Sequence, residues 1–363
     1  MSKLGTLGAR LHRGEVGYDF VGKRKIWYGV SILITILAIA GLFGRGLHMG
    51  IEFQGGAVFT TPKTGVSVSQ AESYAEEASG HDAIVQGLGT GGMRIQVAGI
   101  DTDKSDAIKT ELADKLKVDS EEINAELVGP SWGEQIANKA WQGLAIFMVL
   151  VVIYLAIAFE WRMALAALVA LIHDITITVG IYALVGFEVT PGTVIGLLTI
   201  LGYSLYDTVV VFDSLKEGTN GITKQTRWTY RDVANRSING TLVRSINTTV
   251  VALLPVAGLL FIGGGVLGAG MLNDISLSIF VGLAAGAYSS IFIATPLVAD
   301  LKEREPEMKA LRRRVLAKRA QAGEGATAVA AAGAGTADDP EGSGPAVVGP
   351  RAGRSGRASG KRR

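Results

Sequence analysis

The sequence predicts a membrane protein: a bundle of six transmembrane α-helices with one α+β domain outside the membrane, between the first and second spans. Of the 363 residues, 48% are hydrophobic and only 19% are charged, whereas a soluble chain carries about 25% charged residues. The apolar residues are concentrated in six runs that are long enough to cross a bilayer. The long interval between the first two runs has the periodicity of a folded domain.

The composition excludes several classes of function. The net charge of +2 gives no reason to expect a nucleic-acid partner. The absence of cysteine excludes disulfides, thiolate metal sites and cysteine nucleophiles. No metal-ligand spacing, phosphate-binding loop or nucleophile elbow is present. We therefore expect no enzymatic activity, no cofactor and no metal site, so that any work must draw on an ion gradient or on a partner protein.

The N-terminal segment, residues 1–25, is basic and has no apolar core, so we expect no cleavable signal peptide and a first span that acts as its own insertion signal. Since a transmembrane helix needs about 20 residues, we expect spans at 26–43, 137–158, 163–185, 191–213, 243–262 and 275–298. The last five form one helical region, residues 137–300. Very short connections make tight hairpins of spans two and three and of spans three and four.

Basic residues predict the orientation. They gather in the N-terminal segment, in the loop between the fourth and fifth spans, and after the sixth span. With six spans, all three regions lie on the same side, which the positive-inside rule assigns to the cytoplasm. We therefore expect both termini in the cytoplasm and the connection 44–136 outside.

The connection 44–136 has the pattern of a small domain. GGAVFTT, DAIVQGL, MRIQVAG and INAELVG are typical of strands, and VSQAESYAEEAS and DTDKSDAIKTELADKLK are typical of helices. Asp101 or Thr102 is the expected N-cap of the second helix. The resulting order, β-α-β-β-α-β, is that of the ferredoxin-like fold.

The C-terminal tail, residues 301–363, is basic. From about residue 321 it is rich in Ala, Gly, Pro and Arg without helical periodicity, and such a segment buries too little apolar surface to fold, so we expect disorder there. The basic stretch 309–319 is expected to lie against anionic lipid headgroups. A more specific contact, for example with the ribosome, is the alternative.

An acidic residue lies inside the fourth apolar run. Residues 201–218 read LGYSLYDTVVVFDSLKEG, and a carboxylate such as Asp207 at bilayer depth costs roughly 2.5–3.5 kcal/mol on insertion scales. That cost predicts a function for Asp207. Asp213 follows six residues later, where it is either a solvated acid at the interface or part of a proton pathway.

The fifth span carries a polar stripe. Ser237, Thr241, Arg244 and Thr248 share one helical face by their spacing. Arg244 is permanently charged and needs a counter-charge, for which Asp207 is the candidate because the two helices are antiparallel. Two interpretations remain open. The pair is a structural ion pair that fixes helix register, or Asp207 exchanges protons, since burial disfavours its charge and the arginine favours it.

The third span holds a further acid at mid-membrane depth. Asp174 lies in HDITIT, and its role is either a polar relay or packing. Its neighbour His173 is expected to be an interior histidine and not a ligand.

Several stretches together resemble one family. Five stretches occur in the order GIEFQGGAVF, VGPSWG, HDITITVG, GYSLYDTVVVFDSLKE and NRSINGTLVRSINTT. They resemble the signatures of the SecD/SecF family of bacterial protein-export membrane proteins, most closely its SecF members. The resemblance covers about residues 20–300. It implies similarity to half of a resistance–nodulation–division transporter and a place in the bacterial cytoplasmic (inner) membrane. The implied partners are a SecD-like subunit, the Sec translocon and translocating unfolded proteins, and the implied energy source for late export steps is the proton-motive force.

The resemblance also implies residue roles. The acid of the family's GYSxxDT signature corresponds to Asp207 and the arginine of its TxxRS/T signature to Arg244, which are the family's proton-pathway positions. The chain departs from the family at Tyr206, where the signature often has Asn, and at Glu52, where it has Asp. We expect the first departure to change hydrogen bonding near Asp207.

Two other functions remain as alternatives. A scaffold for translocon assembly or membrane insertion would tolerate joint neutralisation of Asp207 and Arg244. A stand-alone proton-coupled exporter of small molecules would carry both transporter halves in one chain, with twice as many spans and a second external domain. The single half present here favours a protein that works with a partner.

Overall fold

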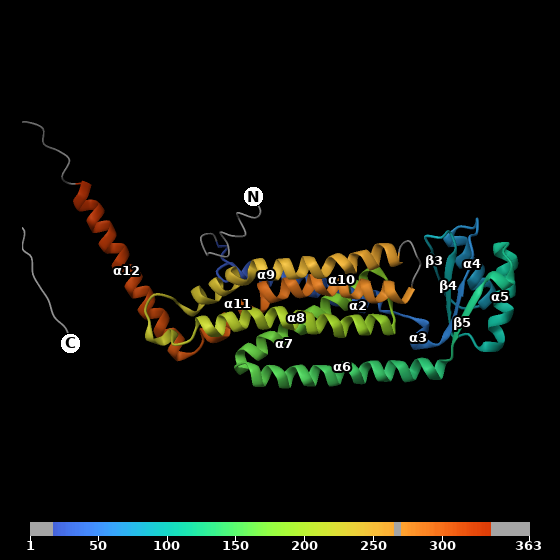
Figure 1. The fold of residues 1–363 in the computed structure, drawn as a ribbon, viewed down its shortest axis with the longest axis horizontal. Helices are drawn as coiled ribbons and strands as arrows, with labels where there is room; N and C mark the ends of the chain where they lie inside the picture. Colours follow the sequence, from blue (N-terminus) through green and yellow to red (C-terminus); the bar gives the residue numbers. More distant parts are fainter. Residues whose placement is uncertain (1–16, 265–269, 335–363) are drawn as a thin grey trace, which may run out of the picture. The chain divides into compact units, whose positions relative to one another are not determined.

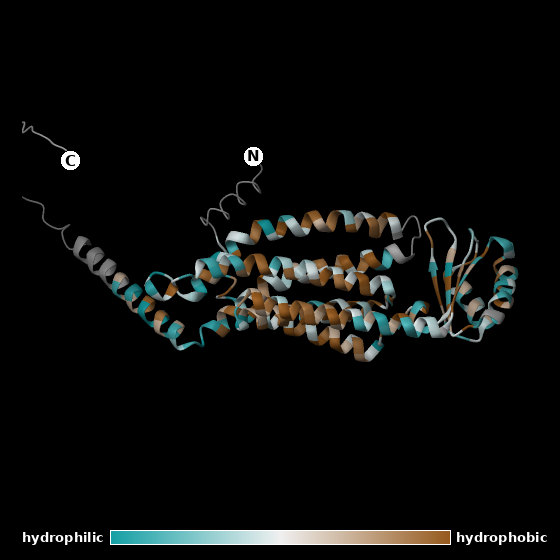
Figure 2. Cartoon of the chain, turned by 60° about the horizontal axis from the view of Figure 1, so that its bottom comes forward, coloured by the Kyte–Doolittle hydropathy of each residue, from teal (hydrophilic) through white to brown (hydrophobic). Residues whose placement is uncertain are grey.

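The computed structural model describes residues 17–264 and 270–334 (Figure 1). The chain divides into one unit of residues 1–315 and a second of residues 316–363. In the described residues, six helices are long and apolar enough to cross a membrane, which confirms the six predicted spans. They extend over Arg24–Arg45, Ser131–Ala158, Trp161–Val185, Pro191–Lys224, Tyr230–Gly263 and Asn273–Lys302. Figure 2 shows hydrophobic residues along these helices and hydrophilic residues gathered near their ends.

Six α-helices, some with clear local start or stop signals, form most of these spans. They are α2 (Arg24–Arg45), α6 (Pro130–Ala158), α7 (Trp161–Val185), α8 (Pro191–Gly218), α9 (Tyr230–Gly258) and α10 (Gly270–Ser289). Thr190 and Thr229 cap α8 and α9 through capping boxes with Thr193 and Asp232. Gly186 ends α7 with a φ of 84°, a conformation that glycine adopts without strain.

The sixth span changes its helical winding midway. α10 ends at Ser289, the π-helical turn η4 covers Ser290–Ala294, and α11 continues over Thr295–Lys302. Pro296 lacks an N–H, and its ring would clash with the carbonyl of Phe292 in a regular α-helix, so the wider π turn relieves the crowding.

A seam of small residues joins α8 and α10. Gly196 packs against Ser278, Gly282 against Ile200, and Gly286 against Ser204. Both partners advance by four residues at each step, so the two helices run in the same direction. A methyl group on any of these glycines would overlap its neighbour, which is how small residues bring transmembrane helices close together.

A similar contact joins α2 to α7. Gly180 packs against Ala38, and Gly41 packs against Leu184. Here too the pairing advances in the same direction along both helices, so the first and third spans are parallel.

The segment between the first two spans forms a domain with the predicted order of elements. It comprises β2 (Gly56–Thr60), α4 (Val68–Ser79), β3 (Ala83–Gly87), β4 (Met93–Ala98), α5 (Thr102–Leu116) and β5 (Asn124–Val128). The sheet order is β3-β4-β2-β5 with all pairs antiparallel. Phe59 and Ile95 of the sheet share one buried cluster with Ala75 of α4 and Leu112 of α5, so both helices cover the same face.

Short elements connect this domain to the helices. β1 (His48–Met49) pairs in parallel with β6 (Glu188–Val189), which lies in the connection between α7 and α8. The short helix α3 (Ile51–Gln54) follows β1, and Gly133 of α6 packs directly on the backbone of Phe53. The helix ends at Arg45, Pro130, Val185 and Pro191 form the domain end of the bundle, and those at Arg24, Ala158, Gly218 and Tyr230 form the opposite end.

The prediction of disorder from about residue 321 is wrong for its first part. Helix α12 covers Pro306–Ala334. Alanine has the highest intrinsic helix propensity, so an alanine-rich segment continues the helix without the apolar periodicity that marks a packed one. The remaining predicted tail, residues 335–363, lies outside the described residues.

Candidate functional site

Asp207 is buried in the bundle and receives two serine hydroxyls. It lies on α8 with only 6% of its surface exposed. The Oγ of Ser245, on α9, donates to its Oδ1 at 2.6 Å, and the Oγ of Ser290, the first residue of η4, donates to its Oδ2 at 2.5 Å. These lengths are typical of hydroxyl–carboxylate bonds. The predicted acid is therefore held by neutral groups from two neighbouring helices.

Asp174 has the same kind of surroundings. It lies on α7, is 1% exposed, and its Oδ2 accepts from the Oγ of Ser204 at 2.5 Å and of Ser289 at 2.8 Å. His173 brings its Nδ1 to 3.5 Å from the other oxygen, Oδ1. The sequence places Asp174 in the membrane but gives no partner for it. The structure connects it, through the adjacent residues Ser289 and Ser290, to the surroundings of Asp207.

Arg244 and Asp207 are both described in the structure, and they do not form the predicted ion pair. Arg244 donates from Nη2 to the hydroxyl of Tyr206 at 2.8 Å, and its side chain is exposed in this single chain. Neighbouring residues of a helix point about 100° apart, so Tyr206 and Asp207 face different directions. Ser245, which follows Arg244, takes the place expected for the arginine. Tyr206, where the family signature often has Asn, accepts the hydrogen bond of Arg244.

Asp213 lies apart from both buried acids. It is exposed and lines a polar cavity of about 780 Å³ at the opposite end of the bundle, together with Glu160, Lys302 and Glu305. Lys302 makes ion pairs with both of these glutamates. Asp213 is therefore a solvent-accessible acid on the same helix as Asp207.

A polar cluster at the domain end was not predicted. Glu188, in the connection between α7 and α8, is 8% exposed and lies near Gln96 and Arg94 of β4 and Glu52 of α3. Arg94 Nη2 is 3.9 Å from Glu52 Oε1. Burial raises the pKa of Glu188, and the negative charge of Glu52 adds to this effect, while Gln96, Arg94 and His48 oppose it. Sequence reasoning missed Glu188 because a lone acid in a short loop has the pattern of an ordinary solvated turn.

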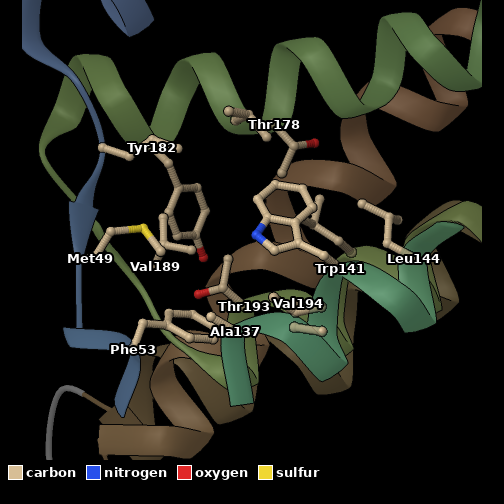
Figure 3. A pocket seen from close by; sticks show the side chains of 14 residues that line it. Met49, Phe53, Ala137, Trp141, Leu144, Thr178, Tyr182, Val189, Thr193 and Val194 are labelled. Atoms are coloured by element: carbon tan, nitrogen blue, oxygen red, sulfur yellow. The ribbon is translucent and has the colours of Figure 1, made fainter. Parts of the chain in front are cut away.

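An apolar pocket of about 110 Å³ lies beside this cluster. Figure 3 shows the rings of Trp141 and Tyr182 pointing into it, with Met49, Phe53 and Thr193 around them. Its lining offers few of the polar groups that orient a small-molecule ligand. Among the described residues, no group of three or more acidic or histidine side chains is arranged to hold a metal ion.

Ionic and amide contacts at the opposite end were also missed by the sequence. Asp300 pairs with Arg24 at 2.7 Å and with Arg231 at 3.1 Å. The side-chain amides of Asn235 and Asn239, on α9, bind the backbone of the segment before α2, at Phe20 and Tyr18. These contacts join α2, α9 and α11, three helices far apart in the sequence.

Comparison with known proteins agrees with the motifs. The family model "Protein export membrane protein SecD/SecF, C-terminal" matches residues 107–304, and "SecD/SecF GG Motif" matches residues 40–62. The protein translocase subunit SecF of Streptomyces coelicolor is 80% identical over an alignment of 373 positions, which covers 100% of both chains. SecF of Mycobacterium tuberculosis H37Rv is 40% identical over 88% of this chain and 75% of its own.

A solved structure is also similar. The crystal structure of SecDF, a translocon-associated membrane protein from Thermus thermophilus, aligns with a TM-score of 0.69 at 30% identity. The alignment covers 82% of this chain and 41% of that one, so this chain spans less than half the length of that SecDF. These matches show that the chain belongs to the SecD/SecF family of protein-export membrane proteins, as a SecF-type protein translocase subunit.

Proposed function

We propose that this chain pairs with a SecD-like subunit and uses the proton-motive force to promote late steps of protein translocation across the bacterial cytoplasmic membrane. The observation that carries the proposal is the environment of Asp207. A serine hydroxyl both donates and accepts, so Ser245 and Ser290 can serve the carboxyl in its charged and its neutral form. A site of this kind permits proton exchange at membrane depth.

Arg244 supports the need for a partner. Its guanidinium is permanently charged, lies midway along a membrane-spanning helix, and is exposed in this single chain beside Tyr206. Charged groups in a membrane face a protein interior or water. The SecD-like subunit, and with it an acidic counter-charge, would cover this face. This chain matches 41% of the SecDF chain of Thermus thermophilus, and the rest of that chain is long enough to include a second subunit.

We infer that the domain between the first two spans is ferredoxin-like and lies outside the cytoplasm, where it is the moving part. Its β-α-β-β-α-β order and antiparallel four-stranded sheet support the assignment. The clusters of lysine and arginine at the opposite end of the bundle support cytoplasmic termini, and the basic tail would lie on anionic lipids. A proton moving down ~150 mV releases about 3.5 kcal/mol, which is enough to bias two packings that differ by a few kcal/mol.

The test is the variant Asp207→Asn. It preserves shape and hydrogen-bonding capacity but cannot release a proton, so the chain should insert and bind its partner while proton-dependent export disappears. Export is measured with and without an uncoupler, in membranes that hold matched amounts of each variant. Asp213→Asn, at the exposed acid on the same helix, is the control and should lose much less. Uncoupler-sensitive export that survives in Asp207→Asn would refute proton coupling at this site and favour the scaffold alternative.

A further inference from the structure

Two consecutive serines connect the two buried acids. Ser289 and Ser290 are both fully buried, and they lie where α10 passes into the π turn η4. Ser289 donates to Asp174 Oδ2 at 2.8 Å, and Ser290 donates to Asp207 Oδ2 at 2.5 Å. Carboxyls from two different helices, α7 and α8, are thus bound by the side-chain hydroxyls of two adjacent residues.

Each serine has a second acceptor within reach. Ser289 Oγ lies 3.2 Å from the carbonyl oxygen of Gly286, and Ser290 Oγ lies 3.3 Å from that of Ala287. A hydroxyl carries a single proton. When a carboxyl takes up a proton, its O–H becomes the donor, and the serine can accept that bond while turning its own proton to the helix carbonyl. The same pair of residues therefore has a hydrogen-bond arrangement for each charge state.

The packing leaves these serines little freedom to move independently of each other. A Cβ atom at Gly286 would lie only 2.9 Å from the Cβ of Ser204, so α8 and α10 are in close contact three residues before Ser289. Ser204 also donates to Asp174, at 2.5 Å. If the backbone at Ser289 and Ser290 moves when one acid changes its charge, the hydroxyl that donates to the other acid moves with it. π turns of this kind often occur at functional sites.

We propose that Ser289 and Ser290 couple the protonation of Asp174 to that of Asp207, so that the two carboxyls bind protons interdependently. The inference rests on the proposed function, because it assumes that Asp207 exchanges protons. The serines are positioning residues that act through the acids. Other ionisable groups around the pair are His173, 3.5 Å from Asp174, Arg244 beside Tyr206, Tyr203 on α8, and Tyr288, which is hydrogen-bonded to Ser31.

The experiment is an infrared titration of the full chain, purified in bilayers, that follows the band of protonated carboxyl groups. The part that disappears in Asp207→Asn reports Asp207. Neutralising the second acid with Asp174→Asn should shift the pH of half-protonation of Asp207 by about one to two units, the size expected from one hydrogen bond to a charged group. In the Ser289→Ala/Ser290→Ala background, at least half of that shift should be lost. Ser278→Ala, a buried serine of the same seam that donates to the carbonyl of Ile275, is the control and should leave the shift unchanged.

The outcomes separate the two proposals. If the effect of Asp174→Asn is the same with and without the serines, the acids interact through space and the serine coupling is refuted. If Asp207 contributes no titrating band at all, the proposed function itself fails. Should the double serine variant not insert, Ser289→Ala and Ser290→Ala are measured singly, and each must reduce the shift for the proposal to stand.

Discussion

Asp174 and Asp207 accept their hydrogen bonds from four serine hydroxyls, Ser204, Ser245, Ser289 and Ser290. A guanidinium in hydrogen-bond contact would stabilise only the charged form of a carboxyl, whereas a hydroxyl can bond to both forms. The residues that surround each acid therefore suit a group that changes charge. Arg244 instead donates to Tyr206, whose side chain points about 100° away from that of Asp207 around α8. The guanidinium is exposed in this single chain and can bind a partner.

The contact between Tyr206 and Arg244 gives the first prediction. Tyr206→Phe keeps the ring beside the guanidinium but removes the hydroxyl that accepts at 2.8 Å. Hydrogen bonds to charged groups contribute about 1.5–3 kcal/mol, so a loss of about tenfold or more in uncoupler-sensitive export is expected. Tyr154→Phe, on the exposed side of α6, is the matched control. Wild-type export by Tyr206→Phe would mean that Tyr206 does not position Arg244.

The sequence identified the ionisable residues that are unfavourable inside a membrane, but not the hydrogen-bond partners that stabilise them there. Asp207, Arg244 and Asp174 stand out because each charge is unexpected in an apolar run. The serines do not stand out, since serine occurs in many membrane helices and its partner depends on how two helices pack. One signal was available: Ser278, Gly282, Gly286 and Ser290 recur every fourth residue, which is typical of a close helix contact.

At the scale of elements, the connection between α7 and α8 joins the helices to the domain. β6 pairs with β1, and Glu188 of β6 is buried against β4 and α3. This element was predicted only as a short turn. Its pairing with residues far earlier in the chain is a tertiary contact that no local pattern contains. The π turn η4 was also not predicted, although Pro296 just after it is a local signal.

Glu188 gives a prediction of pH dependence. Because burial raises its pKa, the folded state binds this proton more tightly than the unfolded state does. The resulting stabilisation is complete below the ordinary glutamic acid pKa of about 4.3 and is lost as the pH rises through the raised pKa. Glu188→Gln is neutral at every pH, so it should match the wild type at about pH 4 and be more stable near neutral pH.

The measurement is thermal unfolding of the purified full chain across this pH range. Glu126→Gln, on the exposed side of β5, is the control and should follow the wild type throughout. A Glu188→Gln variant that is less stable than wild type at neutral pH would show that the carboxylate is needed in its charged form, as a partner of Arg94.

At the scale of the whole molecule, orientation is the inference on which the proposed mechanism depends. Cysteines introduced singly at Asp82 or Lys104, exposed positions of the domain, should react with an impermeant thiol reagent added outside cells. Cysteines at Lys224 or Arg319 should react only after the membrane is opened. The chain has no cysteine of its own, so the background is clean. The reverse labelling would place the domain in the cytoplasm.

The packing of α2 on α7 gives a prediction for assembly. Gly180→Ala places a methyl group on Ala38, where there is no space, and such overpacking costs about 1–3 kcal/mol. Gly29→Ala, also in a helix, meets no atom within 4 Å and should gain up to about 1 kcal/mol from helix propensity. Thermal unfolding in detergent measures both. Equal effects of the two changes would show that the α2–α7 contact is looser than described.

That same contact constrains how the chain is made. α2 is made before α7, and Gly180 is synthesised only after the whole sheet domain and another span, roughly 7–28 seconds after Ala38 at about 5–20 residues per second. Until then the contact between α2 and α7 cannot form, and lipid or another helix must cover that face of α2. The helix suits this interval, because it has no charged residue between Lys25 and Arg45. The intramembrane charges Asp174, Asp207 and Arg244 all lie in later helices, which enter a membrane that already holds neighbours. An uncharged α2 can therefore lie in the bilayer before its contact with α7 forms.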